Sequence, residues 1–253
     1  MSSFGLLFRA EMVKWRKSWT LLTMILAPTC QVGFLAVILW FSDSLVRRFK
    51  PGFQFWLEIN YLAWNIFFMP IAAVLLSELS WDQETEAKAW THLLLQPVPR
   101  RYHFLVKVLS HASLLLLAQA LLLVLVLLGG LILTGNPGLL MGPLPWGTLG
   151  RFALYAIPAS LPPIALHSWM STRFPGFGFP LAIAFGGTWI SIRLVGSTFP
   201  VQFLPWGMSA HMVVVFERWR TLPWGFLPAC LLLTGGLIAL GTLDFSRQKE
   251  PLK

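Results

Sequence analysis

The chain has 253 residues, of which 56% are hydrophobic and only 11% are charged, and its formal net charge is +9. Its long apolar runs exclude a soluble domain, because about 20 apolar residues suffice to cross the hydrocarbon core of a bilayer. Lysines and arginines placed beside anionic lipid headgroups account for the basic balance, so no nucleic-acid partner is required. We therefore expect an all-α, multi-pass membrane protein.

The first expected element is a short amphipathic helix, from residue 3 to about residue 17. Apolar residues recur there at helical spacing, while the charged residues lie mostly elsewhere around the helix. This pattern is typical of a helix that lies in the membrane interface. We favour that interpretation over the alternative, in which the basic residues only fix the topology of the chain. The residues of interest in this helix are Glu11, Lys14, Trp15 and Arg16.

Six apolar runs follow, and each is expected to be helical because backbone polar groups in lipid must be paired within the segment. They cover residues 19–41, 56–76, 104–134, 152–170, 177–192 and 224–242. The third run is longer than a bilayer requires, and the fifth is short. Most lysines and arginines fall on the cytoplasmic side if the N-terminus is cytoplasmic, so both termini are expected inside.

Proline and glycine indicate where these spans deviate from plain helices. Pro158, Pro162 and Pro163 predict a kink or local unwinding in the fourth span. Gly186 and Gly187 allow another helix to approach the fifth span closely.

Several kinds of chemistry are missing from the sequence. There is no G-x-x-x-x-G-K-[ST] phosphate loop, so we expect no ATP site in this chain. The two cysteines lie inside predicted spans and the histidines are scattered, so no disulfide, metal site or bound cofactor is expected. No carboxylate lies within spans three to six and no catalytic pair lies in any span, which argues against a proton-coupled carrier and an intramembrane enzyme.

The most organised polar segment lies between the second and third spans. Acidic residues come first, an apolar ridge follows, and prolines and arginines end the segment: Glu84, Glu86, Trp90, Leu94, Pro97, Arg100 and Arg101. Acidic residues suit the beginning of a helix and proline its end, so we expect a short separate helix here. An apolar ridge outside the bilayer is typical of a contact surface; the alternative is an ordinary solvated loop.

This segment resembles the coupling region of ABC-2-type transporter permeases. The pattern consists of Glu86, Trp90, residues 93–95, Pro97, Arg100 and Lys107. In that family a cytoplasmic helix between spans two and three ends in a Pro-x-x-Arg-like turn and fits a groove on the ATPase subunit. The basic cluster with an acidic residue ahead of the first span resembles the family's elbow helix. The compact size and Trp90 resemble permeases linked to lantibiotic and bacitracin self-protection, although Lys88–Ala89 stands where many relatives carry Gly-Thr.

The resemblance implies one ABC-2-type transmembrane domain over residues 1–253. It places an elbow helix at 1–17, a cytoplasmic coupling loop at 77–103 and a re-entrant outer segment at 195–223. The residues alone leave the outer segment open between a re-entrant hairpin and a loop lying on the bilayer.

The resemblance also implies the permease subunit of an ABC exporter in the cell inner or plasma membrane. A partner ATPase would bind ATP and Mg²⁺, and a second copy of this chain or a homologous permease would complete the transporter. The expected substrate is an amphipathic peptide, an antibiotic or a lipid-like molecule. The alternative function is a membrane scaffold or assembly factor that recruits a cytoplasmic protein without transport.

Overall fold

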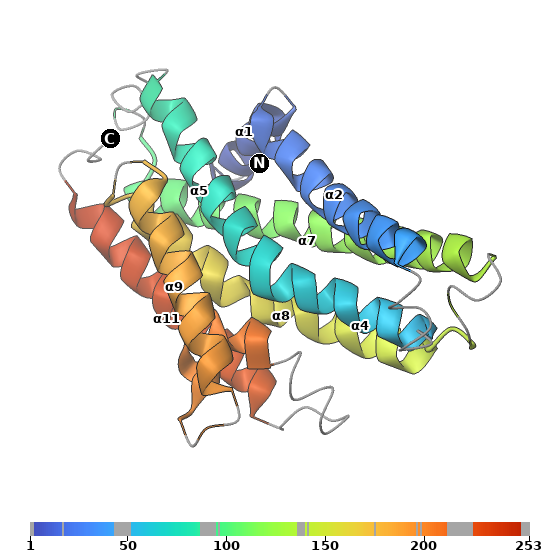
Figure 1. Ribbon diagram of the computed structural model, residues 1–253. Coiled ribbons are helices and arrows are strands. Elements are labelled where there is room, and N and C mark those ends of the chain that lie inside the picture. Colours follow the sequence, from blue (N-terminus) through green and yellow to red (C-terminus); the bar gives the residue numbers. More distant parts are fainter. Residues whose placement is uncertain are drawn as a thin grey trace.

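The structure is a computed structural model that describes residues 3–16, 18–42, 52–86, 95, 97–135, 140, 142–174, 176–195, 197, 199–211 and 225–248. Its regular elements are all helical within these residues (Figure 1). In chain order they are α1 (Ser3–Trp15), α2 (Trp19–Phe41), α4 (Phe53–Ala63), the π-helical turn η1 (Trp64–Phe68), α5 (Met69–Glu86), α7 (Arg100–Thr134), α8 (Trp146–Met170), α9 (Gly178–Leu194), the 3-10 turn η2 (Val201–Phe203) and α11 (Phe226–Arg247).

In the part of the chain that the structure describes, five helical stretches are long and apolar enough to cross a membrane. They are α2, the continuous stretch α4–η1–α5, α7, α8 and α11. The predicted fifth span corresponds to α9, an apolar helix of 17 residues. At 1.5 Å per residue it is about 25 Å long, slightly less than the hydrocarbon core of about 30 Å. The expectation of multiple helical spans is therefore confirmed, and α9 differs from the other five in length.

The helix α7 is the central element of the bundle and packs against α1, α2, α5, α8 and α11 (Figure 1). Its contact with α4 is close because Gly130 of α7 lies against the ring of Phe53. Trp56 of α4 is fully buried beside it and donates its indole N–H to the carbonyl of Val126 at 2.8 Å. The buried indole donor is thus satisfied by a backbone carbonyl.

The fourth span, α8, contains all three of the expected prolines inside one continuous helix. Each proline removes one backbone donor from the helical ladder, which leaves a carbonyl free to accept from elsewhere. One such carbonyl is that of Ala159, whose helical donor would be residue 163, and Ser209 donates to it at 3.2 Å. Gln119 of α7 also donates to α8, at the carbonyl of Ala156, over 3.3 Å.

The beginning of the chain and the end of α11 lie at the same end of α7. Glu11 of α1 approaches Lys107 in the second turn of α7. At the first residue of α7, the guanidinium of Arg100 donates to the carbonyl of Gln248, directly after α11. This end of the bundle therefore gathers α1, the end of α5, the start of α7 and the end of α11.

Candidate functional site

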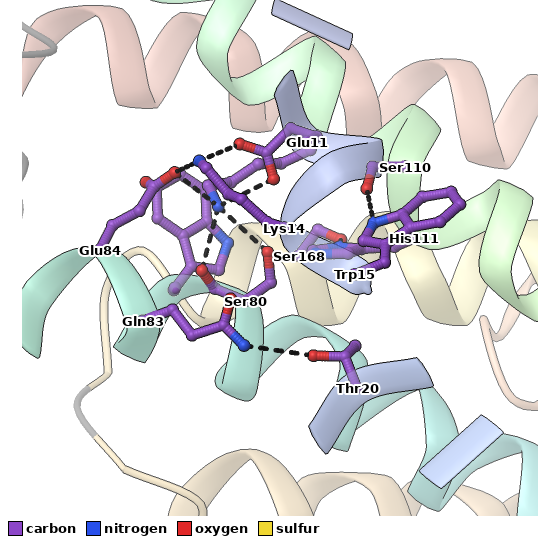
Figure 2. A network of polar contacts seen from close by, with 12 residues as sticks. Glu11, Lys14, Trp15, Thr20, Ser80, Gln83, Glu84, Ser110, His111 and Ser168 are labelled. Atoms are coloured by element: carbon purple, nitrogen blue, oxygen red, sulfur yellow. Dashed lines mark hydrogen bonds and ion pairs between the residues drawn. The ribbon is translucent and has the colours of Figure 1, made fainter. Parts of the chain in front are cut away.

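Four charged side chains from three helices meet at this end of the bundle, and we call them the charge cluster: Glu11 and Lys14 of α1, Glu84 of α5 and Lys107 of α7. The ammonium of Lys14 lies 2.5 Å from Glu11 Oε1 and 2.6 Å from Glu84 Oε1. The ammonium of Lys107 lies 3.1 Å from Glu84 Oε1 and 3.7 Å from Glu11 Oε2. Figure 2 shows Glu11, Lys14 and Glu84 converging from opposite sides of this junction. Each carboxylate therefore faces both ammonium groups.

Lys107 is the most deeply buried charge of the cluster, with only 2% of its surface exposed. Its ammonium also donates to the carbonyl and the hydroxyl of Ser80, each at 3.0 Å. It lies 5.0 Å from the ring centroid of Trp81, within the range of a cation–π contact. A buried ammonium is tolerated only when it is paired and hydrogen-bonded, and these partners from α5 and α1 meet both conditions.

The charges of α1 are held in their ionised forms by this arrangement. Burial by itself would raise the pKa of Glu11, but the ammonium groups of Lys107 and Lys14 outweigh it and lower the pKa to about 2. For Lys14, burial would lower the pKa, but the carboxylates of Glu84 and Glu11 outweigh it and raise the pKa. Glu11 and Lys14 therefore carry full charge at neutral pH.

Polar contacts continue from the charge cluster into the bundle (Figure 2). The indole N–H of Trp15 donates to the Ser110 hydroxyl at 2.9 Å, which ties α1 to α7 a second time. One turn beyond Lys107, His111 Nδ1 lies 2.8 Å from the hydroxyl of Ser168, and that hydroxyl lies 3.4 Å from the hydroxyl of Ser77. The helices α5, α7 and α8 are thereby joined through buried polar atoms.

The structure brings together four of the residues predicted as functional. Glu84, assigned to the coupling segment, contacts Lys14 of the predicted elbow helix, and Glu11 lies beside them. Trp15, also predicted, is buried against α7. Arg16 is exposed immediately after α1 and takes no part in the cluster's ion pairs.

The other predicted coupling residues that the structure describes take no part in the ion pairs of the charge cluster. Glu86 is exposed at the end of α5. Pro97 is exposed ahead of α7, and Arg101 is exposed in its first turn. Arg100 contacts the chain after α11 instead. Trp90 and Leu94 lie outside the described residues.

The acidic residues of this segment are arranged differently from the prediction. They were expected at the beginning of a short separate helix, but Glu84 and Glu86 form the end of α5, which continues without interruption from the second span. A carboxylate at a helix C-terminus gains nothing from the helix dipole. The ammonium groups of Lys14 and Lys107 compensate the charge of Glu84 instead.

Lys107 is the site residue whose role the sequence did not reveal. It was part of the family pattern, but nothing in the local sequence identified its partners, which lie 23 or more positions away along the chain. The sequence did contain one signal that Lys107 has an acidic partner. It is a single lysine in an apolar run, and such a charge in a helix interior requires an acidic partner. Glu11 also lies on the buried face of α1, where the wheel pattern had placed apolar residues.

A second ion pair lies beside Arg100 at the same end of the bundle. The guanidinium of Arg173, after α8, binds the carboxylate of Asp244 in α11. The indole of Trp169 donates to the same carboxylate at 2.9 Å. Hydrogen bonding to Asp244 is the main reason that the pKa of Arg173 is raised.

The described part of the segment between α9 and α11 packs back into the bundle. The indole N–H of Trp206 lies 3.1 Å from Nε2 of His167, in the last turn of α8. The ring of Trp206 also covers Gly187 in the middle of α9, where an added Cβ would come within 2.2 Å of it. Met208 and Ser209 are fully buried. The part of this segment that the structure describes thus lies against both α8 and α9.

Groups that would hold a metal ion are absent from the described residues: no three His, Cys, Asp or Glu side chains gather in one place there. Cys30 is exposed, Cys230 is buried, and both are free thiols.

The chain was compared with known proteins. Residues 7–191 match the family described as ABC-2 family transporter protein. A search of curated proteins found no match. The matched region begins inside α1 and ends inside α9, so it contains the whole charge cluster and the segment between α5 and α7. Because this region covers well over half of the chain, the protein belongs to the ABC-2 family of transporter proteins.

Proposed function

We propose that this protein is the permease subunit of an ABC exporter and that the charge cluster transmits force from a separate ATPase subunit. The ATPase would press on the segment between α5 and α7. Two residues separate this segment from Glu84, and seven residues separate it from Lys107. Glu84 and Lys107 are bound to each other and to α1. A displacement of that segment would therefore move the ends of three helices together.

The energetics of buried charge support this role. Breaking a buried ion pair by removing one partner typically costs about 3–5 kcal/mol. If α1 separated from α5 or α7, Glu11, Glu84 and Lys107 would each lose an ion-pair partner in apolar surroundings. Moving the three helix ends as one body avoids it, so the charge cluster favours rigid transmission over local bending.

The proposed assembly follows from the family and from the missing phosphate loop. ATP and Mg²⁺ would be bound by the partner ATPase, and a second copy of this chain or a homologous permease would complete the transporter. The charge cluster would face the cytoplasm, with both termini on that side of the inner or plasma membrane. Transport would carry an amphipathic peptide, an antibiotic or a lipid-like substrate outward, as in lantibiotic and bacitracin self-protection.

The coupling assignment is tested with the purified complex of permease and ATPase. The double variant Glu86→Ala/Trp90→Ala removes exposed Glu86 at the end of α5 and the tryptophan of the predicted coupling segment, and it leaves all four residues of the charge cluster in place. We expect stimulation of ATP hydrolysis and export to fall at least about tenfold, since this corresponds to about 1.4 kcal/mol of lost contact. Membrane insertion and thermal stability should stay unchanged.

The matched control replaces a glutamate and a tryptophan away from this segment, Glu58 in α4 and exposed Trp189 in α9, with alanine. Unchanged hydrolysis and export in Glu86→Ala/Trp90→Ala would overturn the coupling assignment. A partner that binds this segment without ATP-driven export in the intact protein would instead favour the scaffold function.

A further inference from the structure

The helix α8 has a gap in its backbone hydrogen bonds where two prolines follow each other. Pro162 and Pro163 have no N–H, so the carbonyls four positions earlier, at residues 158 and 159, receive no α-helical bond. Proline is the commonest cause of a sharp kink in a helix. The gap therefore divides α8 into two pieces that can bend relative to each other.

Residues 199–211, which we call the return segment, bind α8 on both sides of this gap. Ser209 donates its hydroxyl to the carbonyl of Ala159, in the first piece, at 3.2 Å. Trp206 donates its indole N–H to Nε2 of His167, in the second piece, at 3.1 Å. Backbone hydrogen bonds within the return segment hold the two donors in one compact turn. The return segment thus bridges the gap.

The bond from Trp206 holds the second piece of α8. His167 is fully buried, and its other ring nitrogen, Nδ1, has no hydrogen-bond partner among the described residues. Trp206 therefore supplies the one hydrogen bond that this ring makes there. Loss of the bond would leave both ring nitrogens buried without a partner, which is unfavourable. The two pieces of α8 are thereby kept together through the return segment.

The second piece of α8 is also tied to the charge cluster. Ser168, next to His167, lies 2.8 Å from Nδ1 of His111, and His111 follows Lys107 by one turn of α7 (Figure 2). The carboxylate of Asp244 in α11 holds the far end of the piece. The piece can therefore tilt with α7 while its far end stays on α11.

We propose that the return segment is a latch that holds the two pieces of α8 together, and that Ser168 is the positioning residue through which the charge cluster releases it. Movement of the ends of α5 and α7 would draw Ser168 along with His111 and tilt the second piece. Trp206 cannot follow, because its segment is bonded to the first piece and to α11. The bond to His167 then breaks and the return segment comes free. The source of this movement rests on the proposed function.

A native thiol reports on this release. Cys230 of α11 is fully buried, and its thiol donates to the sulfur of Met208, in the return segment, at 2.8 Å. Release of the return segment would uncover it, and the labelling rate of a buried group follows the population of its open state. Replacing exposed Cys30 with alanine leaves Cys230 as the only thiol of the chain.

The first test measures how fast N-ethylmaleimide labels Cys230 in the purified complex of permease and ATPase, without nucleotide and with ATP. In the Cys30→Ala parent we expect ATP to raise the rate about tenfold, the effect of one broken buried hydrogen bond. Stimulated ATP hydrolysis with an unchanged Cys230 rate would overturn the latch alone. Absence of stimulated hydrolysis would overturn the coupling assignment instead, and the nucleotide-free rate of Trp206→Phe then decides on the latch.

The variant Trp206→Phe removes the indole donor and keeps a ring against Gly187. We expect the nucleotide-free labelling of Cys230 to rise about tenfold, with little further increase when ATP is added. Trp189→Phe, at an exposed tryptophan of α9, is the matched control and should label as the parent does. A nucleotide-free rate equal to that of the parent would contradict the latch. A raised rate that ATP still increases tenfold would also contradict it, because Trp206 then only packs.

The variant Ser168→Ala breaks the tie to α7 and leaves the latch closed. We expect its nucleotide-free rate to stay at the parent value and ATP no longer to raise it, whereas Ser168→Thr keeps a hydroxyl and should restore the response. Ser171→Ala is the matched control, because this buried hydroxyl donates to the carbonyl of His167 within the same turn. Thermal midpoints establish that both alanine variants fold. Equal ATP responses in Ser168→Ala and Ser171→Ala would overturn the role of Ser168.

Discussion

Lys107 illustrates how one buried charge organises this end of the molecule. It is the only cation of the charge cluster that is almost fully buried, and it contacts carboxylates from two other helices. Its ion-pair and hydrogen-bond partners are all distant in sequence. The stability of the junction between α1, α5 and α7 should therefore depend on it strongly.

Replacing Lys107 with methionine removes the charge and keeps an apolar chain of similar length. We expect the free energy of unfolding to fall by about 3–5 kcal/mol, because Glu11 and Glu84 then lose their buried counter-ion. Unfolding in detergent, followed by tryptophan fluorescence, measures this loss. The double variant Lys107→Met/Glu84→Gln restores neutrality and should recover part of the stability. Arg9→Met, on the exposed face of α1, is the control and should stay within about 0.5 kcal/mol of the parent.

The pH dependence of stability should report on Glu11. Its pKa falls from an ordinary value of 4.5 to about 2 in the folded protein. A carboxylate with a lowered pKa stabilises the fold above the unfolded-state value, and this stabilisation is lost as the pH falls from 4.5 towards 2. We expect Glu11→Gln to flatten the stability profile in this window. A variant profile as steep as that of the parent would contradict the assigned pKa.

At the scale of elements, helix length explains where the charge cluster lies. The stretch Phe53–Glu86 has 34 residues and α7 has 35. Each is about 50 Å long, roughly 20 Å more than the hydrocarbon core. Both helices therefore extend beyond the core, and their extensions carry Glu84 and Lys107. The short helix α1 packs on these extensions, so charged residues are buried between helices outside the most apolar layer.

The contact between α9 and the segment that follows it, up to α11, depends on a glycine. An added Cβ at Gly187 would lie 2.2 Å from the ring of Trp206, whereas one at Gly186 would meet nothing within 4 Å. We expect Gly187→Ala to lower the unfolding free energy by about 1–3 kcal/mol through overpacking, and to weaken the bond from Trp206 to His167. Gly186→Ala is the matched control. Equal thermal midpoints for the two variants would show that the segment between α9 and α11 does not rest on α9.

At the scale of the whole molecule, the positions of α1 and the end of α11 bear on the number of crossings. Both lie at the start of α7. Chain ends on one side of a membrane require an even number of crossings. Five long helices alone give an odd number, so the short helix α9 would supply the sixth.

Cysteine labelling tests this topology. Ser3→Cys and Gln248→Cys are introduced separately into a Cys30→Ala/Cys230→Ala background, and intact cells are treated with a membrane-impermeant thiol reagent. We expect both positions to be protected in intact cells and labelled after lysis, since both should face the cytoplasm. Labelling of only one position in intact cells would place the ends on opposite sides and show that α9 does not cross.

The sequence by itself determined the class of this protein, because an apolar run long enough to span a bilayer must be helical whatever surrounds it. It located the polar segment between spans two and three, and it placed Glu11, Lys14 and Glu84 among the candidate functional residues. Only the tertiary structure showed that Glu84 pairs with Lys14, 70 positions away, and that both gather around Lys107. Helical periodicity fixes which residues share a face of one helix, but the partner of that face depends on packing between helices. The same limit applied to Arg100, because no local pattern indicates that it contacts Gln248, directly after α11.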